Sequence, residues 1–177
     1  PVVGKLTTLG YVVMFAPIGF VLAMGLGFNK FSYPVILFLF LLYAAVMGAS
    51  ISFIFLAYTA SSIYGTFAAA AGMFGLMAVV GYTTHTDLTK FGSLMMMALV
   101  GLIVASIINW FLGSSQLDYI ISFVGVLVFT GLTAYDVQKL KRIGAGVEFG
   151  NETTSKLVIM GALNLYLDFV NLFLFLL

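Results

Sequence analysis

The sequence predicts an all-α integral membrane protein. Of its 177 residues, 63% are hydrophobic and only 7% are charged, and the mean hydropathy is +1.19. Soluble domains carry roughly 25% charged residues, so a water-soluble globule of this composition is excluded. The apolar runs are long and continuous rather than short and alternating, which excludes a transmembrane β-barrel.

Charged and polar residues divide the chain into six predicted membrane spans. No charge lies between Lys5 and Lys30, and about 20 apolar residues form roughly 30 Å of helix, enough to cross a bilayer. The 56 uncharged residues between Lys30 and Asp87 are too many for one span, and the polar segment Tyr58–Ser62 divides them in two. We therefore expect residues 1–177 to form a single transmembrane domain with short loops. The predicted spans are Leu9–Phe28, Pro34–Ala57, Ile63–Tyr82, Phe91–Leu112, Asp118–Gln138 and Lys156–Leu177.

The basic residues predict how these spans are oriented. Cytoplasmic loops of membrane proteins carry an excess of lysine and arginine, and one side of this chain carries six such residues against Lys5 alone on the other. With that side in the cytoplasm, residue 1 lies outside. A full-length protein that starts in the cytoplasm would then have one further helix before residue 1 and seven spans in all. The six residues are Lys30, Lys90, Lys139, Lys141, Arg142 and Lys156.

Several kinds of chemistry are absent from the sequence. The chain has no cysteine and a single histidine, His85, so disulfides, thiolate catalysis and multi-histidine metal sites are excluded. It contains no phosphate-binding loop, no nucleophile–base arrangement and no zinc-ligand spacing. We therefore expect no enzymatic activity and no cofactor. The absence of a basic patch with interleaved aromatic residues argues against nucleic-acid binding.

The last predicted span contains an intramembrane carboxyl group, which is costly and therefore a functional candidate. Asp168 lies twelve residues after Lys156, or roughly 18 Å into the helix, too far for its short side chain to reach water. Gly161, Asn164, Asp168 and Asn171 follow helical spacing and form one polar stripe. We expect this stripe to face the interior of the helix bundle, with its helix the most enclosed.

Asp136 is the second candidate, at the cytoplasmic end of the preceding span, with Thr133 three residues earlier on the same face. One interpretation makes Asp136 a wetted interfacial carboxylate and Asp168 a hydrogen-bonded structural group. In the other, the two carboxyl groups meet and share a proton, or bind a hard cation such as Ca²⁺. Asn164, Asn171 and Thr133 would then line or support the path of the ion.

Two segments resemble the Bax inhibitor-1 family, also called the transmembrane Bax inhibitor motif family. They are Gly131–Asp136 and Gly161–Phe173, which carry the two aspartates. Gly48–Phe55 and Tyr82–Thr84 extend the resemblance, which covers nearly the whole chain and is closest to the bacterial members.

The resemblance implies a seven-helix membrane bundle with the last helix central, in the bacterial inner membrane. It implies a pH-sensitive Ca²⁺ leak channel in which an aspartate pair, here Asp136 and Asp168, controls the pore, with calcium ions and protons as its ligands. The chain departs from the family in one respect. Characterised bacterial relatives have an acidic residue in the second helix, whereas Leu9–Phe28 has none, Pro17 stands near that position, and Lys30 is the only nearby cation.

Two other functions are weighed against the leak channel. Some bacterial relatives are said to regulate a membrane quality-control protease, so the alternative is a non-conducting partner of another membrane protein. An intramembrane aspartyl protease is disfavoured, because the Gly-x-Gly-Asp surroundings of those enzymes are absent around Asp136 and Asp168.

Overall fold

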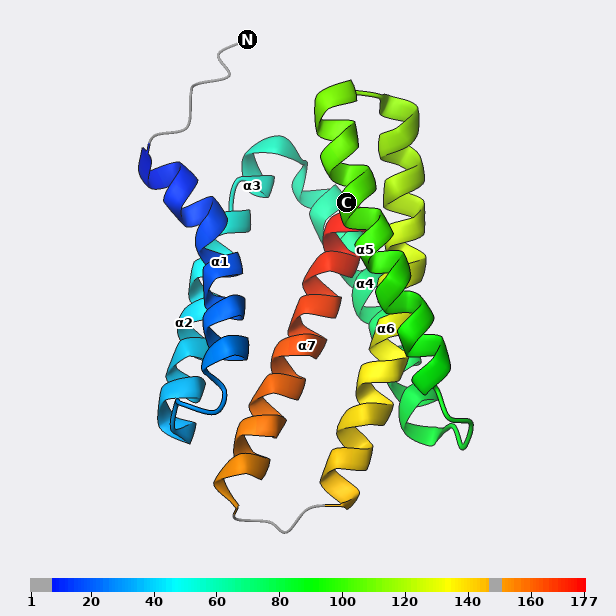
Figure 1. The fold of residues 1–177 in the computed structure, drawn as a ribbon. Helices are drawn as coiled ribbons and strands as arrows, with labels where there is room; N and C mark the ends of the chain where they lie inside the picture. The colour runs from blue at the N-terminus through cyan, green and yellow to red at the C-terminus, as the bar shows by residue number, and fades with distance from the viewer. Residues whose placement is uncertain (1–7, 147–150) are drawn as a thin grey trace. The chain divides into compact units, whose positions relative to one another are not determined.

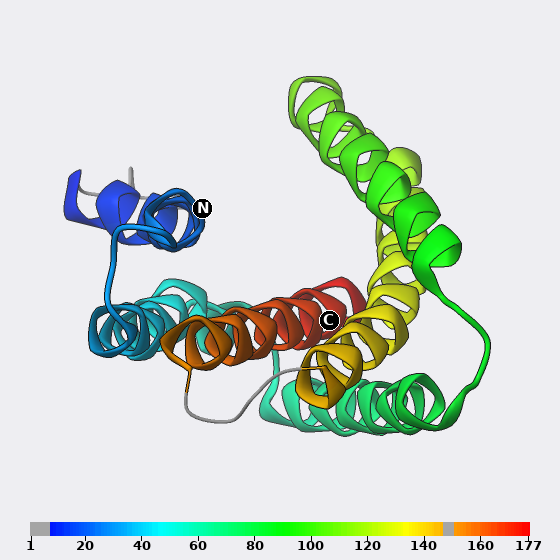
Figure 2. The same cartoon turned by 60° about the horizontal axis from the view of Figure 1, so that its bottom comes forward.

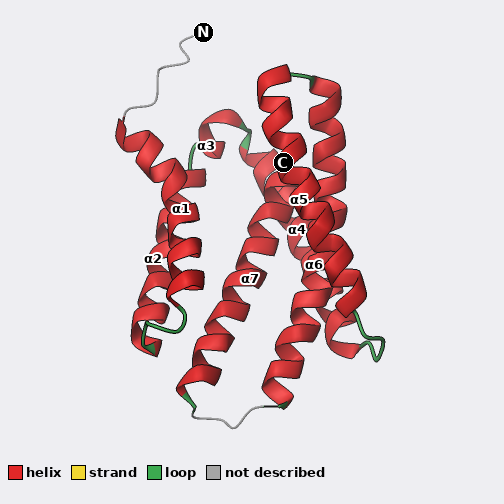
Figure 3. Cartoon of the chain, viewed as in Figure 1, coloured by secondary structure: helices red, strands yellow, loops and turns green. Residues whose placement is uncertain are grey.

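The computed structural model describes residues 8–146 and 151–177, and within these residues it contains helices and loops but no strand (Figures 1 and 3). The all-α prediction is confirmed. The helices are α1 (Thr8–Gly27), α2 (Tyr33–Ile51), α3 (Ile54–Ala57), α4 (Ala60–Thr83), α5 (Thr89–Leu112), α6 (Ser115–Ala145) and α7 (Glu152–Leu176).

Five of the six predicted spans correspond to segments long and apolar enough to cross a membrane. They are Tyr33–Ala57, Ala60–Thr83, Thr89–Leu112, Ser115–Ala145 and Glu152–Leu176. The remaining predicted span, Leu9–Phe28 at the start of the chain, coincides with α1, where Ala16–Gly27 forms a shorter apolar helix. The number of six spans therefore stays a prediction. The first of the five is interrupted between α2 and α3, where the Ser52 hydroxyl donates to the Ala49 carbonyl at 2.7 Å, a bond that competes with the helical ladder.

The basic cluster after Gln138 belongs to a helix and not to a loop. Helix α6 continues to Ala145, so Lys139, Lys141 and Arg142 occupy its last two turns. Basic residues are favourable there because the carboxyl end of a helix carries partial negative charge. The Lys141 ammonium also donates to the Tyr82 carbonyl at 2.6 Å. Lys5, the single basic residue expected on the opposite side, lies outside the described residues.

The described chain divides into two compact units, the first of which comprises residues 8–60 and 151–160. Within it, α1 and α2 run side by side and antiparallel (Figures 1 and 2). Lys156 is 9% exposed, and its ammonium group donates to the carbonyls of Phe28 and Phe31 at 3.2 and 3.1 Å. The Glu152 carboxylate accepts from the Tyr33 amide at 3.1 Å. The first turns of α7 are therefore fixed to the connection between α1 and α2.

The second unit comprises residues 61–146 and 161–177. In it α5 and α6 form an antiparallel hairpin (Figure 2). Gly113 ends α5 in the left-handed conformation, with φ of 61°, which costs glycine little because it has no Cβ. Ser114 then caps α6, since its hydroxyl accepts from the Leu117 amide at 3.3 Å. These two residues reverse the chain.

Helices α6 and α7 have larger buried shares than the other described spans. The largest share belongs to α6 and the next to α7, and the expectation that the Asp168 helix is the most enclosed stays a prediction. Glycine makes the packing close: a Cβ atom at Gly81 of α4 would overlap the Ala134 carbonyl of α6, and one at Gly125 the Phe175 ring. Helix α6 therefore contacts both α4 and α7.

Polar contacts fix the connection between α4 and α5 to α6. The Gln138 side chain is 5% exposed, donates to the Thr86 carbonyl at 2.8 Å and accepts from the Leu88 amide at 2.9 Å. The Arg142 guanidinium donates to Gln138 at 2.7 Å and to the Asp87 carboxylate at 2.8 Å. The loop therefore depends on side chains of the last two turns of α6.

The contact between α4 and α6 leads to a stability prediction. Substitution Gly81→Ala places a methyl group on the Ala134 backbone, and overpacking of this kind costs about 1–3 kcal/mol. Gly65→Ala, in the same helix, meets no atom within 4 Å and should be neutral or slightly stabilising, because alanine is the better helix former. Unfolding in mild detergent, followed by circular dichroism, measures both. Equal stability of the two variants would contradict the close approach.

The Asp87 contacts predict a pH dependence. The Thr89 hydroxyl and amide donate to Asp87 at 2.6 and 2.9 Å, and with Arg142 they hold the pKa of this carboxyl well below its ordinary value of 3.8. A lowered folded pKa stabilises the protein above the unfolded pKa, and the contribution is lost as the pH falls through the folded value. The melting-temperature difference between wild type and Asp87→Asn should therefore shrink below about pH 4.

Thr89→Val serves as the control for this prediction. It removes the hydroxyl that contributes most to the lowered pKa of Asp87, so the pH-dependent difference should be smaller in this background. A difference between wild type and Asp87→Asn that stays constant with pH would contradict the assignment.

Candidate functional site

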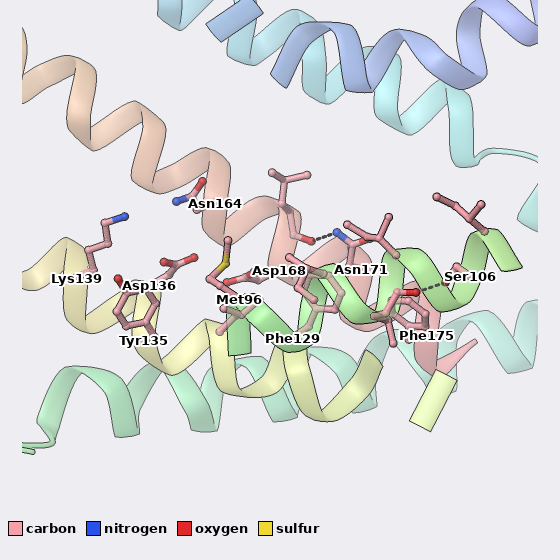
Figure 4. Close-up of a pocket in the computed structure, with 16 residues that line it drawn as sticks. Met96, Ser106, Phe129, Tyr135, Asp136, Lys139, Asn164, Asp168, Asn171 and Phe175 are labelled. Carbon is pink, nitrogen blue, oxygen red and sulfur yellow. Dashed lines mark hydrogen bonds between the residues drawn. The ribbon is translucent and has the colours of Figure 1, made fainter. Parts of the chain in front are cut away.

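Side chains of helices α5, α6 and α7 line a partly open cavity of about 690 Å³ within the second unit (Figure 4). Its size falls in the range of small-molecule sites, which are mostly apolar with a few placed polar groups. The polar part comes from α6 and α7, whereas α5 contributes apolar side chains and one serine. The lining residues used below are Met96, Leu99, Ile103, Ser106, Tyr135, Asp136, Lys139, Asn164, Asp168 and Asn171.

The polar stripe of the last helix places three of its four members in this cavity. Asn164, Asp168 and Asn171 all line it, as expected for residues that share one helical face. The Asn171 amide donates to the Leu167 carbonyl at 2.8 Å, which leaves its carbonyl oxygen for another partner. Gly161 lies instead beside the Leu140 side chain, which a Cβ would overlap.

Asp136 and Asp168 line the same cavity, and Figure 4 shows their carboxyl ends pointing toward one another. The two groups lie close enough to interact electrostatically. Asp168 is 4% exposed, and its Oδ2 atom is buried without a hydrogen-bond partner among the described residues. A buried carboxylate oxygen without a partner is costly, so this atom favours the arrival of a proton or a cation.

One residue of the site, Lys139, was not expected there from the sequence. Lys139 lines the cavity and lies within electrostatic reach of Asp136, and its ammonium group lies 6.0 Å from the centre of the Tyr135 ring. The predicted span Asp118–Gln138 ends one residue before Lys139, which was therefore expected in a loop. Had the helix been extended, the three-residue spacing from Asp136 would have indicated an i, i+3 pair.

Thr133 lies close to the site in the chain but does not line the cavity. It is fully buried, and its hydroxyl donates to the Phe129 carbonyl of its own helix at 2.8 Å. The described residues contain no cluster of three or more histidine, cysteine, aspartate or glutamate side chains suited to a metal. Two carboxyl groups and neighbouring amides are nevertheless hard oxygen donors of the kind that Ca²⁺ prefers.

These features define a polytopic α-helical membrane protein with a carboxyl pair inside its last two helices. Residues 2–177 match the family model described as Inhibitor of apoptosis-promoting Bax1, and the chain belongs to this family, the Bax inhibitor-1 family. The inner membrane protein YbhL of Escherichia coli K12 is 46% identical over 166 residues, which cover 93% of this chain and 71% of the relative.

Other bacterial relatives are similar to the same extent. A Borreliella burgdorferi protein is 48% identical over 90% of this chain and 68% of its own length. The Rickettsia prowazekii protein RP147 is 44% identical over 96% of this chain and 72% of its own length. The resemblance expected from the aspartate segments is confirmed. The chain is a multi-pass inner-membrane protein in contact with lipid, of a family known as channels or regulators and not as enzymes.

The unpartnered oxygen of Asp168 predicts an unusual effect on stability. Burying a polar atom without a hydrogen-bond partner costs free energy, and an apolar side chain of similar size avoids that cost. We therefore expect Asp168→Leu to unfold at an equal or higher temperature than wild type in detergent, since Asp136 keeps Lys139 as a counter-charge. Asp118→Leu removes an exposed carboxylate from the first turn of α6 and should be neutral or slightly destabilising. A strong loss of stability in Asp168→Leu would make Asp168 a structural residue.

Proposed function

We propose that this chain forms a pH-sensitive Ca²⁺ leak pathway in which Asp136 and Asp168 act as one ion-binding unit. The observation that carries the proposal is the position of both carboxyl groups in one cavity, with the Asp168 Oδ2 atom buried and unpartnered. Membership of the Bax inhibitor-1 family supports it.

The pH sensitivity follows from competition for the same oxygen atoms. Two carboxylates close together in apolar surroundings repel one another, so the pair holds either a proton or a cation. As the pH falls, protons occupy the pair and remove the charge that Ca²⁺ needs. Lys139 of α6 is the only other charged side chain among the lining residues, and α5 contributes none.

In this proposal, the ammonium group of Lys139 is the counter-charge of the carboxyl pair. Helix α1 contains no acidic or basic residue, so no charged partner for the pair comes from that helix. The ammonium group of Lys139 interacts with Asp136 across one helical turn. It has to move away from Asp136 when a divalent ion binds both carboxylates. The balance between Lys139, protons and Ca²⁺ then sets the occupancy of the site.

The decisive experiment measures Ca²⁺ flux into proteoliposomes at several pH values. We expect wild type to conduct Ca²⁺ in a pH-dependent manner, and Asp136→Asn and Asp168→Asn to flatten the pH response, because asparagine keeps the size of the side chain but cannot titrate. Asp118→Asn, which alters an exposed carboxyl outside the cavity, should retain the wild-type response.

Two outcomes would overturn the proposal. An unchanged pH response in Asp168→Asn would separate the carboxyl pair from gating. A folded wild-type protein without flux above that of empty liposomes would instead favour the alternative of a non-conducting partner that regulates another membrane protein, such as a quality-control protease.

A further inference from the structure

The cavity has a long apolar part that ion binding leaves unused. Asn164 and Phe175, at its two ends along α7, are separated by about 16 Å at the helical rise of 1.5 Å per residue. Met96, Leu99 and Ile103 form the wall on α5, and Met96 and Ile103 are 50% and 52% exposed. A bare metal ion contacts none of this surface.

The polar part of the cavity carries an unbalanced charge. When both carboxyl groups are ionised, Asp136 and Asp168 face the single ammonium group of Lys139, which leaves one net negative charge among the lining side chains. One monovalent cation neutralises this charge, whereas an anionic headgroup would be repelled by the carboxylates. An ammonium group also supplies three N–H donors, and the Asp168 Oδ2 atom is a buried acceptor without a partner.

From this combination we infer that the cavity binds a lipophilic ammonium ion, a molecule with one primary amine and an apolar chain. Its ammonium group lies between Asp136 and Asp168, and its chain extends along Met96, Leu99 and Ile103. The methionine favours a range of chain shapes, because its side chain is flexible and polarizable. The inference does not require any ion to cross the membrane.

The test compares three probes of equal chain length and different headgroup. Dodecylammonium, dodecanol and dodecanoate are titrated into wild-type protein in phosphatidylcholine nanodiscs at neutral pH, and helix unfolding is followed by circular dichroism. We expect dodecylammonium to raise the melting temperature at concentrations where the alcohol and the carboxylate have no effect. Equal shifts with all three probes would indicate only non-specific partition into the apolar wall and would overturn the inference.

Two pairs of variants separate the charge from the apolar wall. In Asp168→Asn, the dodecylammonium concentration needed for a given rise in melting temperature should increase about tenfold to a hundredfold, the effect of losing a charged hydrogen-bond partner. In Asp118→Asn, this concentration should stay as in wild type. Ile103→Trp fills the part of the cavity beside the apolar wall and should abolish the response to dodecylammonium. Val104, the neighbour of Ile103 on α5, is 50% exposed but does not line the cavity. Val104→Trp should therefore have no effect.

The inference fails if Asp168→Asn binds dodecylammonium as wild type does, or if Ile103→Trp and Val104→Trp respond alike. Its failure is distinct from that of the Ca²⁺ pathway, because the measurement is of binding and not of flux. An amine that binds in a protein without Ca²⁺ flux supports the inference and removes the leak pathway.

Discussion

The need to satisfy two carboxyl groups inside an apolar helix bundle governs the arrangement of the second unit. Asp168 is 4% exposed and cannot reach water as Lys139 and Lys141 can, and Asp136 is only partly exposed. Their helices therefore have to provide polar surroundings. Helices α6 and α7 accordingly have the largest buried shares among the described spans. Their polar faces meet around one cavity, while the α5 side of that cavity is apolar apart from Ser106.

Glycine and aromatic residues make this arrangement possible. Gly81 lets α4 approach the backbone of α6, and the Phe169 ring packs edge-on against Phe67 and Phe74 at 5.5 Å. In lipid, where apolar surface gains nothing by leaving its solvent, such close packing is a main source of helix association. These aromatic contacts are made by a face of α7 that differs from its polar stripe. The stripe therefore remains available to line the cavity.

Much of this arrangement was predictable from the sequence, because the causes are local. The period of Asn164, Asp168 and Asn171 indicated the inward face of α7, and the rarity of charge indicated the spans. What was missed depends on distant partners. The burial of Lys156 requires the carbonyls of Phe28 and Phe31, and the extension of α6 beyond Gln138 involves contacts with Thr86 and Leu88. No local sequence pattern indicates contacts with residues so distant in the chain. Thr133, which we expected to line or support the path of the ion, donates its hydroxyl to the Phe129 carbonyl of its own helix and does not line the cavity.

The two-residue connection between α5 and α6 has a consequence for biogenesis. Gly113 and Ser114 are too few to let one of these helices remain in water while the other crosses the bilayer. The hairpin therefore enters the membrane as a pair, with each helix satisfying its own backbone hydrogen bonds. Asp136 then enters the bilayer beside the apolar face of α5, ahead of the last helix. During that interval the carboxyl group lacks Asp168, and the ammonium group of Lys139 on the same helix is the counter-charge that travels with it.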